Sequence, residues 1–483
     1  MITSIGFKNF RKFRTFPSMS LAPITVLVGG NNAGKSTLVK ALLTVSDFRS
    51  CVTYDEKEGM LFHFDMASTR IGTFCRALCN KSRSNTILFE WVEDRIKYEV
   101  ALLGDPENKN ATTATVVSFK IWDLRLNFQL TYDFAIRQNQ VIFHSKPIKG
   151  YDPRKTHIPD MQKRFEKYFA SISRDIKINV PLCPEDELYG EPISELVRYT
   201  FGILLAASSG ERDFRYQNSQ TIKKLQAELS DDVKEFILNN VWVFRMNRAT
   251  RSSKLFPMNL EYVYAHAANQ TVLYPARNEG DYVTRTIHAF AAPHIQSNKK
   301  VRPFILKWMK KFEIGVDYRL DSVSGEAHMV RVKDTDGKEV FLADKGMGSI
   351  QLMILLFRVA INIAENNVRS TIILEEPELN LHPKMQSMLA DFFYEMLGKN
   401  GSRFIIETHS EYLIRKTQVI VKNEYARWLE EGNDGNPFKV YYMDGGNAKQ
   451  PYYEMEYQPD GAFANDFGEG FFDEASNLAF EIL

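Results

Sequence analysis

The sequence has few cysteines and almost no net charge. Its four cysteines, Cys51, Cys75, Cys79 and Cys183, are too few and too irregularly spaced for a disulfide framework, and they suit a reducing compartment. No second pair follows Cys75 and Cys79 at zinc spacing, so free thiols are the favoured interpretation. Lys and Arg total 61 and Asp and Glu total 60, which leaves a charge of +1 and no global attraction to nucleic acid or to an anionic membrane. Any nucleic-acid site must therefore be a local patch.

Long apolar runs and heptad repeats are also missing. Runs such as LMILLF at 352–357 are followed by Arg358 and Asn362, well short of the roughly 18 to 20 residues that span a bilayer. The opening MITSIGFKNFRKF scatters charges among apolar residues, unlike a secretory signal. No heptad pattern is sustained over roughly three or four repeats, so we expect no long coiled coil. We expect a cytoplasmic protein that does not bind membranes, and we exclude a transporter subunit with its own membrane domain.

A phosphate-binding pattern is present near the start of the chain. Residues 29–37, GGNNAGKST, match G-x-x-x-x-G-K-[ST] and lie between an apolar β-branched run, ITVLV, and a segment with helical spacing. The glycines let the backbone approach phosphates, and the start of the helix adds a positive dipole end. We expect Lys35 to reach the β- and γ-phosphates of ATP and the Ser36 hydroxyl to ligate Mg²⁺. The candidate nucleotide-binding residues of this loop are Gly29, Asn31, Asn32, Gly34, Lys35, Ser36 and Thr37.

Two further segments predict strands that end in polar side chains. STIILEEPELNLHP at 370–383 predicts a buried parallel strand whose carboxyl end presents charge, where α/β sheets keep their ligands. In an ATPase, Glu375 would hold Mg²⁺ and Glu376 would orient the attacking water. SRFIIETHS at 402–410 ends in Thr408 and His409, where a γ-phosphate could be sensed. A lone histidine after a strand is more often structural, but together with a phosphate loop and a paired-acid strand the functional interpretation of His409 is favoured.

Glycines and a serine precede a long apolar helical segment in LADKGMGSIQLMILLF. Backbone N–H groups at the start of that helix would form another phosphate site at Gly346, Gly348, Ser349 and Gln351. One chain has one γ-phosphate to contact, so this segment favours contact with the nucleotide of a second chain. The alternative is a glycine-rich helix start without a ligand.

The middle of the chain changes character twice. Residues 85–145 contain aromatic and β-branched runs with partial alternation, which predict antiparallel strands. Residues 155–245 shift to helical patterns, which predict an inserted helical subdomain. We therefore predict an α/β protein with a mixed-sheet core, divided into an N-terminal ATPase lobe at 1–150, a helical subdomain at 151–265 and a C-terminal ATPase lobe at 266–483.

Taken together, the motifs GGNNAGKST, DKGMGSIQLM, IILEEPELNLHP and IIETHS resemble the Walker A, signature, Walker B with D-loop, and switch-histidine elements of ABC-type ATPases, in particular the SMC/RecF/OLD-like branch. FKNFRKF, LYPAR at 273–277 and GFFDE at 470–474 are similar to ATP-binding proteins of bacterial defence islands, such as those of PARIS, Septu and retron systems. The resemblance implies that Glu376 is the hydrolytic base, that His409 reads the γ-phosphate and that Asn380 lies in a dimer-contact loop. Two departures, Glu375 in place of aspartate and GMGSIQ in place of LSGGQ, imply slow, regulatory hydrolysis.

The function that this resemblance implies is an antiphage sensor or scaffold. It would form a homodimer or higher oligomer around Mg²⁺-ATP and control a separate nuclease or toxin encoded nearby, with a nucleic acid or a phage protein as the trigger. The alternative is a RecF-like DNA-repair ATPase that clamps nucleic acid directly. A stand-alone nuclease is a third hypothesis, although the tail after His409 looks too short for a toprim domain and lacks a D-x-D pair.

One basic stretch bears on the choice between these hypotheses. FRMNRATRSSK places basic residues at three-residue intervals, which permits phosphate contact, although a solvated charged face is commoner. These residues are Arg245, Arg248, Arg251 and Lys254. Arg277 in LYPAR is compatible with either a structural or a nucleotide-proximal role.

Overall fold

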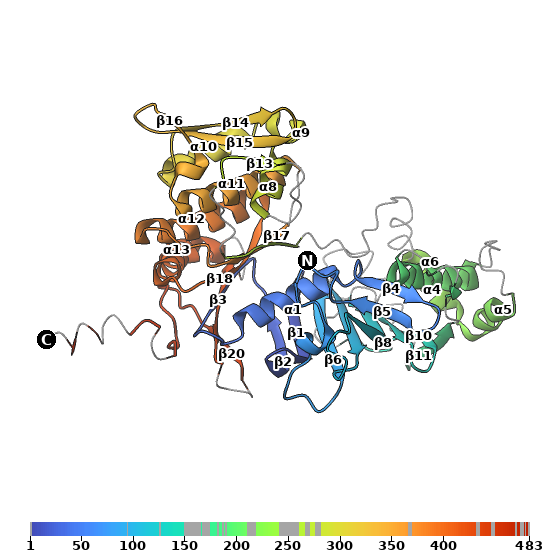
Figure 1. Ribbon diagram of the computed structural model, residues 1–483. Helices are drawn as coiled ribbons and strands as arrows, with labels where there is room; N and C mark the ends of the chain where they lie inside the picture. The colour runs from blue at the N-terminus through green and yellow to red at the C-terminus, as the bar shows by residue number, and fades with distance from the viewer. Residues whose placement is uncertain are drawn as a thin grey trace. The chain divides into compact units, whose positions relative to one another are not determined.

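The computed structural model describes two compact units (Figure 1). Unit 1 comprises Met1–Ser20 and Thr37–Met258, and unit 2 comprises Leu21–Ser36 and Asn259–Leu483. The residues that the structure describes are 2–93, 95–124, 127–148, 166, 174–180, 183–185, 188, 191–209, 219–240, 260–265, 271–275, 282–365, 370–430, 435–445, 450–468, 471–473, 478 and 480–481.

Unit 1 contains a large antiparallel sheet. Eight strands follow the order β11-β10-β9-β8-β7-β6-β1-β2, and β5 joins β4 to β8. Burial alternates strictly along β6, as expected for a sheet that covers a core with one face. The antiparallel lobe is therefore confirmed. The strands are β1 (Ile2–Phe10), β2 (Phe13–Ser20), β4 (Val52–Asp55), β5 (Gly59–His63), β6 (Thr86–Glu93), β7 (Ile96–Leu103), β8 (Thr113–Asp123), β9 (Phe128–Asp133), β10 (Gln138–Phe143) and β11 (Ile176–Val180).

Helices from the segment predicted to be helical pack on this sheet within the same unit. The Tyr132 hydroxyl on β9 donates to the carbonyl of Leu196 at 3.2 Å and lies 2.9 Å from Thr200 Oγ1. The pattern at 221–241 forms two helices, because the first ends before Ser230 and the second begins at Asp231. Most of the predicted helix DMQKRFEKYFASI lies outside the described residues. The helices of unit 1 are α2 (Phe74–Ala77), α4 (Pro192–Ser209), α5 (Ser219–Glu228), α6 (Asp231–Asn240) and most of α1 (Lys35–Asp47).

Unit 2 is built on a mostly parallel sheet. Its order is β12-β17-β18-β3-β19-β20, in which the first five strands run parallel and β20 pairs antiparallel with β19. All five residues of β3 are buried, because helices cover a parallel sheet on both faces. The mixed-sheet core is thus confirmed. The strands are β3 (Ile24–Val28), β12 (Leu260–Val263), β17 (Thr371–Glu375), β18 (Arg403–Glu407), β19 (Phe438–Met443) and β20 (Tyr452–Met455).

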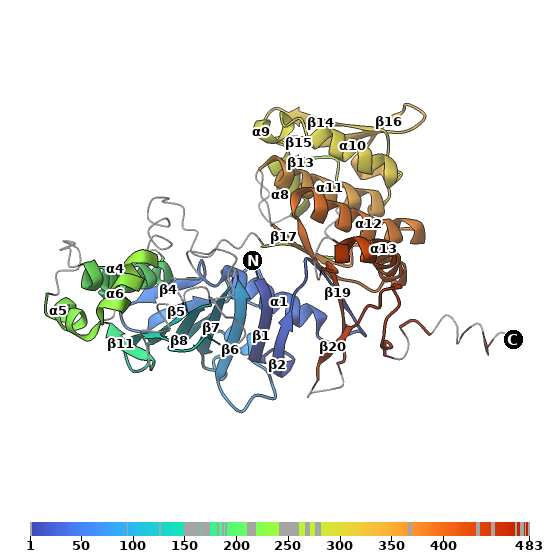
Figure 2. The same ribbon diagram turned by 180° about the vertical axis from the view of Figure 1, so that it is seen from behind.

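A helical layer separates this sheet from a smaller antiparallel one. In Figures 1 and 2, α11, α12 and α13 lie between the parallel sheet and the strands β14 and β15. The helices are α8 (Tyr282–Phe290), α9 (Pro293–Gln296), α10 (Val301–Lys311), α11 (Met347–Ala364), α12 (Pro383–Asn400) and α13 (Glu411–Glu430). The small sheet contains β13 (Tyr274–Pro275), β14 (Asp317–Val323), β15 (Ala327–Lys333) and β16 (Glu339–Phe341), followed by the short 3₁₀ helix η4 (Leu342–Asp344).

Helix α11 is the one helix of the described chain that is long and apolar enough to cross a membrane. Within unit 2, 67% of its 18 residues are buried, which is also the character of a core helix. A single helix of this kind is weak evidence for a membrane span.

Candidate nucleotide-binding site

The glycine-rich loop connects β3 to α1, as its sequence predicts. Gly29 and Gly34 have φ values of +136° and +115°, which glycine adopts without the steric cost that other residues incur. A Cβ on Gly29 would lie 2.5 Å from the carbonyl oxygen of Met443, so the loop also needs glycine for space. Asn31 and Asn32 are exposed at its tip. The loop therefore has the backbone freedom that a phosphate cradle requires.

Lys35 is buried at the start of α1 and folds back onto the loop. Its ammonium donates to the carbonyl oxygens of Gly29 at 2.9 Å and of Gly30 at 3.2 Å. Burial lowers the pKa of Lys35, and the nearby carboxylates of Glu407, Glu376 and Glu378 oppose that shift.

The next residue, Ser36, contacts a carboxylate from a strand that is remote in sequence. Its hydroxyl lies 3.2 and 3.3 Å from the two carboxylate oxygens of Glu407, the last residue of β18, and donates to them. Thr37, the third residue of α1, is buried.

Acidic residues lie at the carboxyl ends of two adjacent parallel strands. Glu375 of β17 and Glu407 of β18 are partners in register, and β18 lies between β17 and β3. Adjacent parallel strands are about 4.8 Å apart, so the two acids end beside each other and beside the loop. Burial raises the pKa of Glu407 to about 7, and the charge of Glu375 acts in the same direction.

Glu376 occupies a strained position directly after β17. Its φ is +44°, a left-handed conformation that is uncommon outside glycine, and its N–H donates to the Glu407 carbonyl at 2.7 Å. One of its carboxylate oxygens lies 3.8 Å from His409 Nε2. Such strain persists where the surroundings hold it, and it is frequent at functional sites.

His409 is held from its backbone by a second buried acid. Its N–H donates to Glu378 Oε1 at 2.7 Å, and burial raises the pKa of Glu378. Burial and the nearby Lys35 ammonium lower the pKa of His409, which favours a neutral imidazole near pH 7. The loop, the acid pair and the histidine therefore lie together.

The first turns of α11 pack against the loop that follows β17. Gln351 donates from Nε2 to the carbonyl of Glu376 at 3.2 Å. A Cβ on Gly348 would lie 2.6 Å from the carbonyl oxygen of Asn380, an exposed residue with φ of +59°. Gly346 is exposed at the N-cap of α11, and Ser349 is half-buried in its first turn.

Sequence reasoning missed Glu407 and Glu378. The signal for Glu407 was present, because it ends an apolar strand just as Glu375 does. Glu378 had no such signal, because it lies in the turn after β17 and its role depends on β18. The basic residues Arg245, Arg248, Arg251, Lys254 and Arg277 lie outside the described residues.

The donor set fits Mg²⁺ bound together with a nucleotide. A search of the described residues finds no group of three or more His, Cys, Asp or Glu side chains that could hold a metal by itself. Mg²⁺ prefers oxygen ligands and usually combines one or two protein groups with phosphates and water. The Ser36 hydroxyl and the carboxylate of Glu375 supply oxygen donors of that kind beside the loop.

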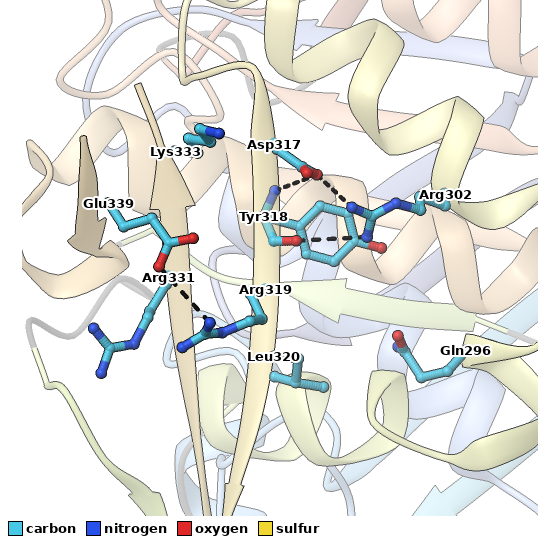
Figure 3. Close-up of a pocket in the computed structure, with 9 residues that line it drawn as sticks. All are labelled: Gln296, Arg302, Asp317, Tyr318, Arg319, Leu320, Arg331, Lys333 and Glu339. Carbon is cyan, nitrogen blue, oxygen red and sulfur yellow. Dashed lines mark hydrogen bonds and ion pairs between the residues drawn. The ribbon is translucent and has the colours of Figure 1, made fainter. Parts of the chain in front are cut away.

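A separate cavity of about 310 Å³ lies on the small antiparallel sheet (Figure 3). Its basic side chains pair with acids: Arg302 lies 2.6 Å from Asp317, and Arg319 lies 3.9 Å from Glu339. The cavity shares no lining residue with the glycine-rich loop or the acids beside it. The lining carries four basic side chains against two acids, although Arg331 also pairs with Asp321 outside the lining, at 3.1 Å.

The family model described as AAA ATPase domain matches residues 1–414. No curated protein matches the chain. Among solved structures, the chain is similar to an Smc head bound to the C-winged helix domain of ScpA (TM-score 0.43, 10% identity, 92% of this chain and 95% of that chain). It is also similar to an Smc head with an extended coiled coil bound to the C-terminal domain of ScpA from Pyrococcus furiosus (TM-score 0.40, 12% identity, 100% of this chain and 99% of that chain). A further similar structure is the SMC head domain from Thermotoga maritima (TM-score 0.33, 9% identity, 95% of this chain and 99% of that chain). TM-scores this low carry no argument about this chain.

Proposed function

Because the chain belongs to the AAA ATPase domain family, we propose that the cluster at the carboxyl ends of β3, β17 and β18 binds Mg²⁺-ATP and hydrolyses it. This proposal is supported by side chains that are far apart in the sequence but lie close together in the structure. Lys35 and Glu407, 372 positions apart in sequence, approach to 4.0 Å beside the glycine-rich loop, and Glu375 is the register partner of Glu407. The carboxyl ends of parallel strands are where α/β sheets place their ligands.

The proposed roles follow from the positions of these side chains. Lys35 exchanges the carbonyls of Gly29 and Gly30 for the β- and γ-phosphates, a stronger charge-assisted interaction. Ser36 and Glu375 hold Mg²⁺, which neutralises charge on the phosphates when it is bound.

Hydrolysis needs a base and a contact to the γ-phosphate. The Glu376 carboxylate orients the attacking water and accepts its proton, and the neighbouring His409 contacts the γ-phosphate through Nε2. Glu378 positions His409 by accepting its backbone N–H. The left-handed backbone of Glu376 has to persist for this alignment.

We propose further that the active form is a dimer around two nucleotides. In the contacts described above, the first turns of α11 meet the loop after β17 rather than the glycine-rich loop. Gly346 at the start of α11 and Asn380 in the loop after β17 are both exposed. The segment Gly346–Gln351 would then complete the site of the opposing subunit. Hydrolysis would be slow and regulatory, as the GMGSIQ sequence implies.

The proposed biological role is control of a separate effector in antiphage defence. It is supported by the motif resemblance to defence-island ATPases. The effector would be a nuclease or a toxin encoded nearby, and its activity would be controlled by whether the chain has ATP bound. The test is to express the wild type and Glu376→Gln with the neighbouring genes and to measure mass, bound partners and phosphate release with and without ATP. We expect Glu376→Gln to bind ATP, release little phosphate and double its mass with ATP.

A matched control is Glu411→Gln, an acid at the start of α13 that pairs with Arg415. A second protein that joins or leaves with ATP would support effector control. If the chain purifies alone and binds DNA when ATP is present, the DNA-repair clamp replaces the effector hypothesis. If Glu376→Gln hydrolyses ATP as fast as the wild type, the proposed base is wrong.

A further inference from the structure

Glu407 is a buried acid at the site to which the roles above assign nothing. Its side chain is 9% exposed, and one carboxylate oxygen lies 4.0 Å from the ammonium of Lys35. The carboxylate also accepts from the hydroxyl of Ser36, at 3.2 and 3.3 Å. Glu407 therefore contacts both residues that are expected to handle the phosphates and the metal.

The charge of Glu407 depends on a positive partner. A buried carboxylate is costly unless it is paired, and its register partner Glu375 carries the same sign of charge. Lys35 supplies the positive charge in the structure. When Lys35 turns to the phosphates of ATP, Glu407 faces additional negative charge and loses its partner, and a divalent cation at Ser36 would restore the balance.

The contact with Ser36 is compatible with metal binding. A serine hydroxyl has one proton and two lone pairs, so it can donate its proton to Glu407 and offer a lone pair to Mg²⁺ at the same time. A carboxylate that accepts from a metal ligand orients that ligand, and loss of such a group typically costs about 10- to 100-fold in metal affinity.

We propose that Glu407 is a positioning residue that makes ATP binding depend on a divalent cation. It accepts the proton of Ser36 and thereby aims the oxygen of Ser36 at Mg²⁺. The negative charge of Glu407 weakens binding of ATP that carries no Mg²⁺ and strengthens binding of the Mg²⁺-ATP complex. This inference rests on the proposed nucleotide site, and it adds a third carboxylate to the two that the motifs indicate.

The test measures binding of a fluorescent ATP analogue, mant-ATP, to the full chain in excess Mg²⁺ and in excess EDTA. The readout is the ratio of the two dissociation constants, which is independent of turnover. In Glu407→Gln, which keeps an acceptor for Ser36 but removes the charge, we expect this ratio to fall by about tenfold, with tighter binding in EDTA. Glu407→Asp keeps the charge and should keep most of the Mg²⁺ dependence.

Glu411→Gln is the control. Glu411 is an acid at the start of α13 that pairs with Arg415 and has no assigned role at the site, so the ratio should stay at the wild-type value. A ratio in Glu407→Gln within about twofold of the wild type overturns the inference, as does an equal loss in Glu407→Asp. If the wild-type chain binds mant-ATP in neither condition, the proposed function itself fails.

Discussion

The two units bury their β-sheets in different ways. In unit 1, burial alternates along β6, and the sheet is antiparallel throughout. In unit 2, β3 is buried at every residue, and its neighbours β18 and β19 run parallel to it. Parallel strands bring all their carboxyl ends to one edge, whereas antiparallel strands alternate their ends between two edges. The chemistry-bearing side chains accordingly gather in unit 2.

The interior of unit 1 instead contains an aromatic ladder across β6, β7, β8 and β9. Trp91 stacks on Tyr98 with centroids 5.0 Å apart, and Phe119 lies 6.3 Å from both Tyr98 and Tyr132. Cross-strand aromatic pairs of this kind stabilise a sheet without providing a reactive group. The aromatic ladder of unit 1 stabilises its sheet, whereas the residues of the proposed nucleotide site lie in unit 2.

The largest expected effect comes from removing the centre of this ladder. Phe119 is fully buried, and Phe119→Ala should lower the free energy of unfolding by about 3 to 5 kcal/mol through lost burial and a cavity. Phe393 in α12, also fully buried, packs 4.7 Å from Phe404 of β18, so Phe393→Ala should cost as much. Urea unfolding monitored by tryptophan fluorescence gives both values.

The two variants should differ in mant-ATP affinity. Phe119→Ala should leave the affinity of the folded protein unchanged, whereas Phe393→Ala should weaken it because β18 carries Glu407. Loss of affinity in folded Phe119→Ala would contradict the assignment of the site to unit 2 alone.

The second prediction concerns two lysines of α1. Lys35→Ala should weaken mant-ATP binding by at least about 100-fold, or about 2.7 kcal/mol, because it removes the charge-assisted contact that Lys35 is proposed to make to the phosphates. Lys40→Ala is the matched control, since Lys40 also donates to a backbone carbonyl, that of Thr69, at 2.8 Å. It should cost about 1 kcal/mol of stability and leave ATP binding intact. Equal losses of binding in the two variants would show a general effect on α1.

The elements at the site were predictable because each motif carries its own local signal. The strand expected before the glycine-rich loop is β3, and the helix expected after it is α1. The apolar runs that end before Glu376 and Thr408 form β17 and β18. Each signal lies within about ten residues of sequence. The glycine spacing indicates the loop, and an apolar run with a polar end indicates each strand. The assignment of roles to these residues remains a prediction.

The elements between residues 260 and 341 were not predicted. β12 has four residues and pairs with β17 more than 100 positions later, and no periodicity in so short a run indicates its partner. Glu407 differs from β12, because its place at the end of an apolar strand was readable in the sequence and only its contact was not. Its importance comes from a contact with Ser36 across 371 positions, which becomes visible only when β18 is placed beside β3.

The third prediction tests the segment proposed to act on a second subunit. In Gly348→Ala the new Cβ would meet the carbonyl oxygen of Asn380 at 2.6 Å, so the start of α11 or the loop after β17 must shift. We expect ATP-dependent dimerisation of the Glu376→Gln background to weaken about tenfold, or about 1.4 kcal/mol, with mant-ATP binding to the monomer unchanged. Analytical ultracentrifugation measures the dimer.

The control is Gly398→Ala in α12, where a Cβ would meet nothing within 4 Å. Alanine is favoured over glycine in a helix, so this variant should be slightly stabilised and should dimerise normally. Normal dimerisation in Gly348→Ala would argue against a contact between this segment and the second subunit.

The smallest expected effect tests how α4 is held on the antiparallel sheet of unit 1. Tyr132→Phe removes a hydroxyl that contacts Leu196 and Thr200, and it should cost about 1 kcal/mol in urea unfolding. The loss of unfolding free energy stays small because Thr200 Oγ1 still donates to the carbonyl of Leu196 at 2.9 Å and still accepts from Asn139 at 2.9 Å. Both buried groups that the Tyr132 hydroxyl contacts therefore keep a hydrogen-bond partner. Tyr412→Phe, at an exposed position of unit 2, should change nothing. If Tyr132→Phe is equally silent, the Tyr132 hydroxyl does not help to hold α4, which then depends on packing and on the hydrogen bond from Asn139 to Thr200.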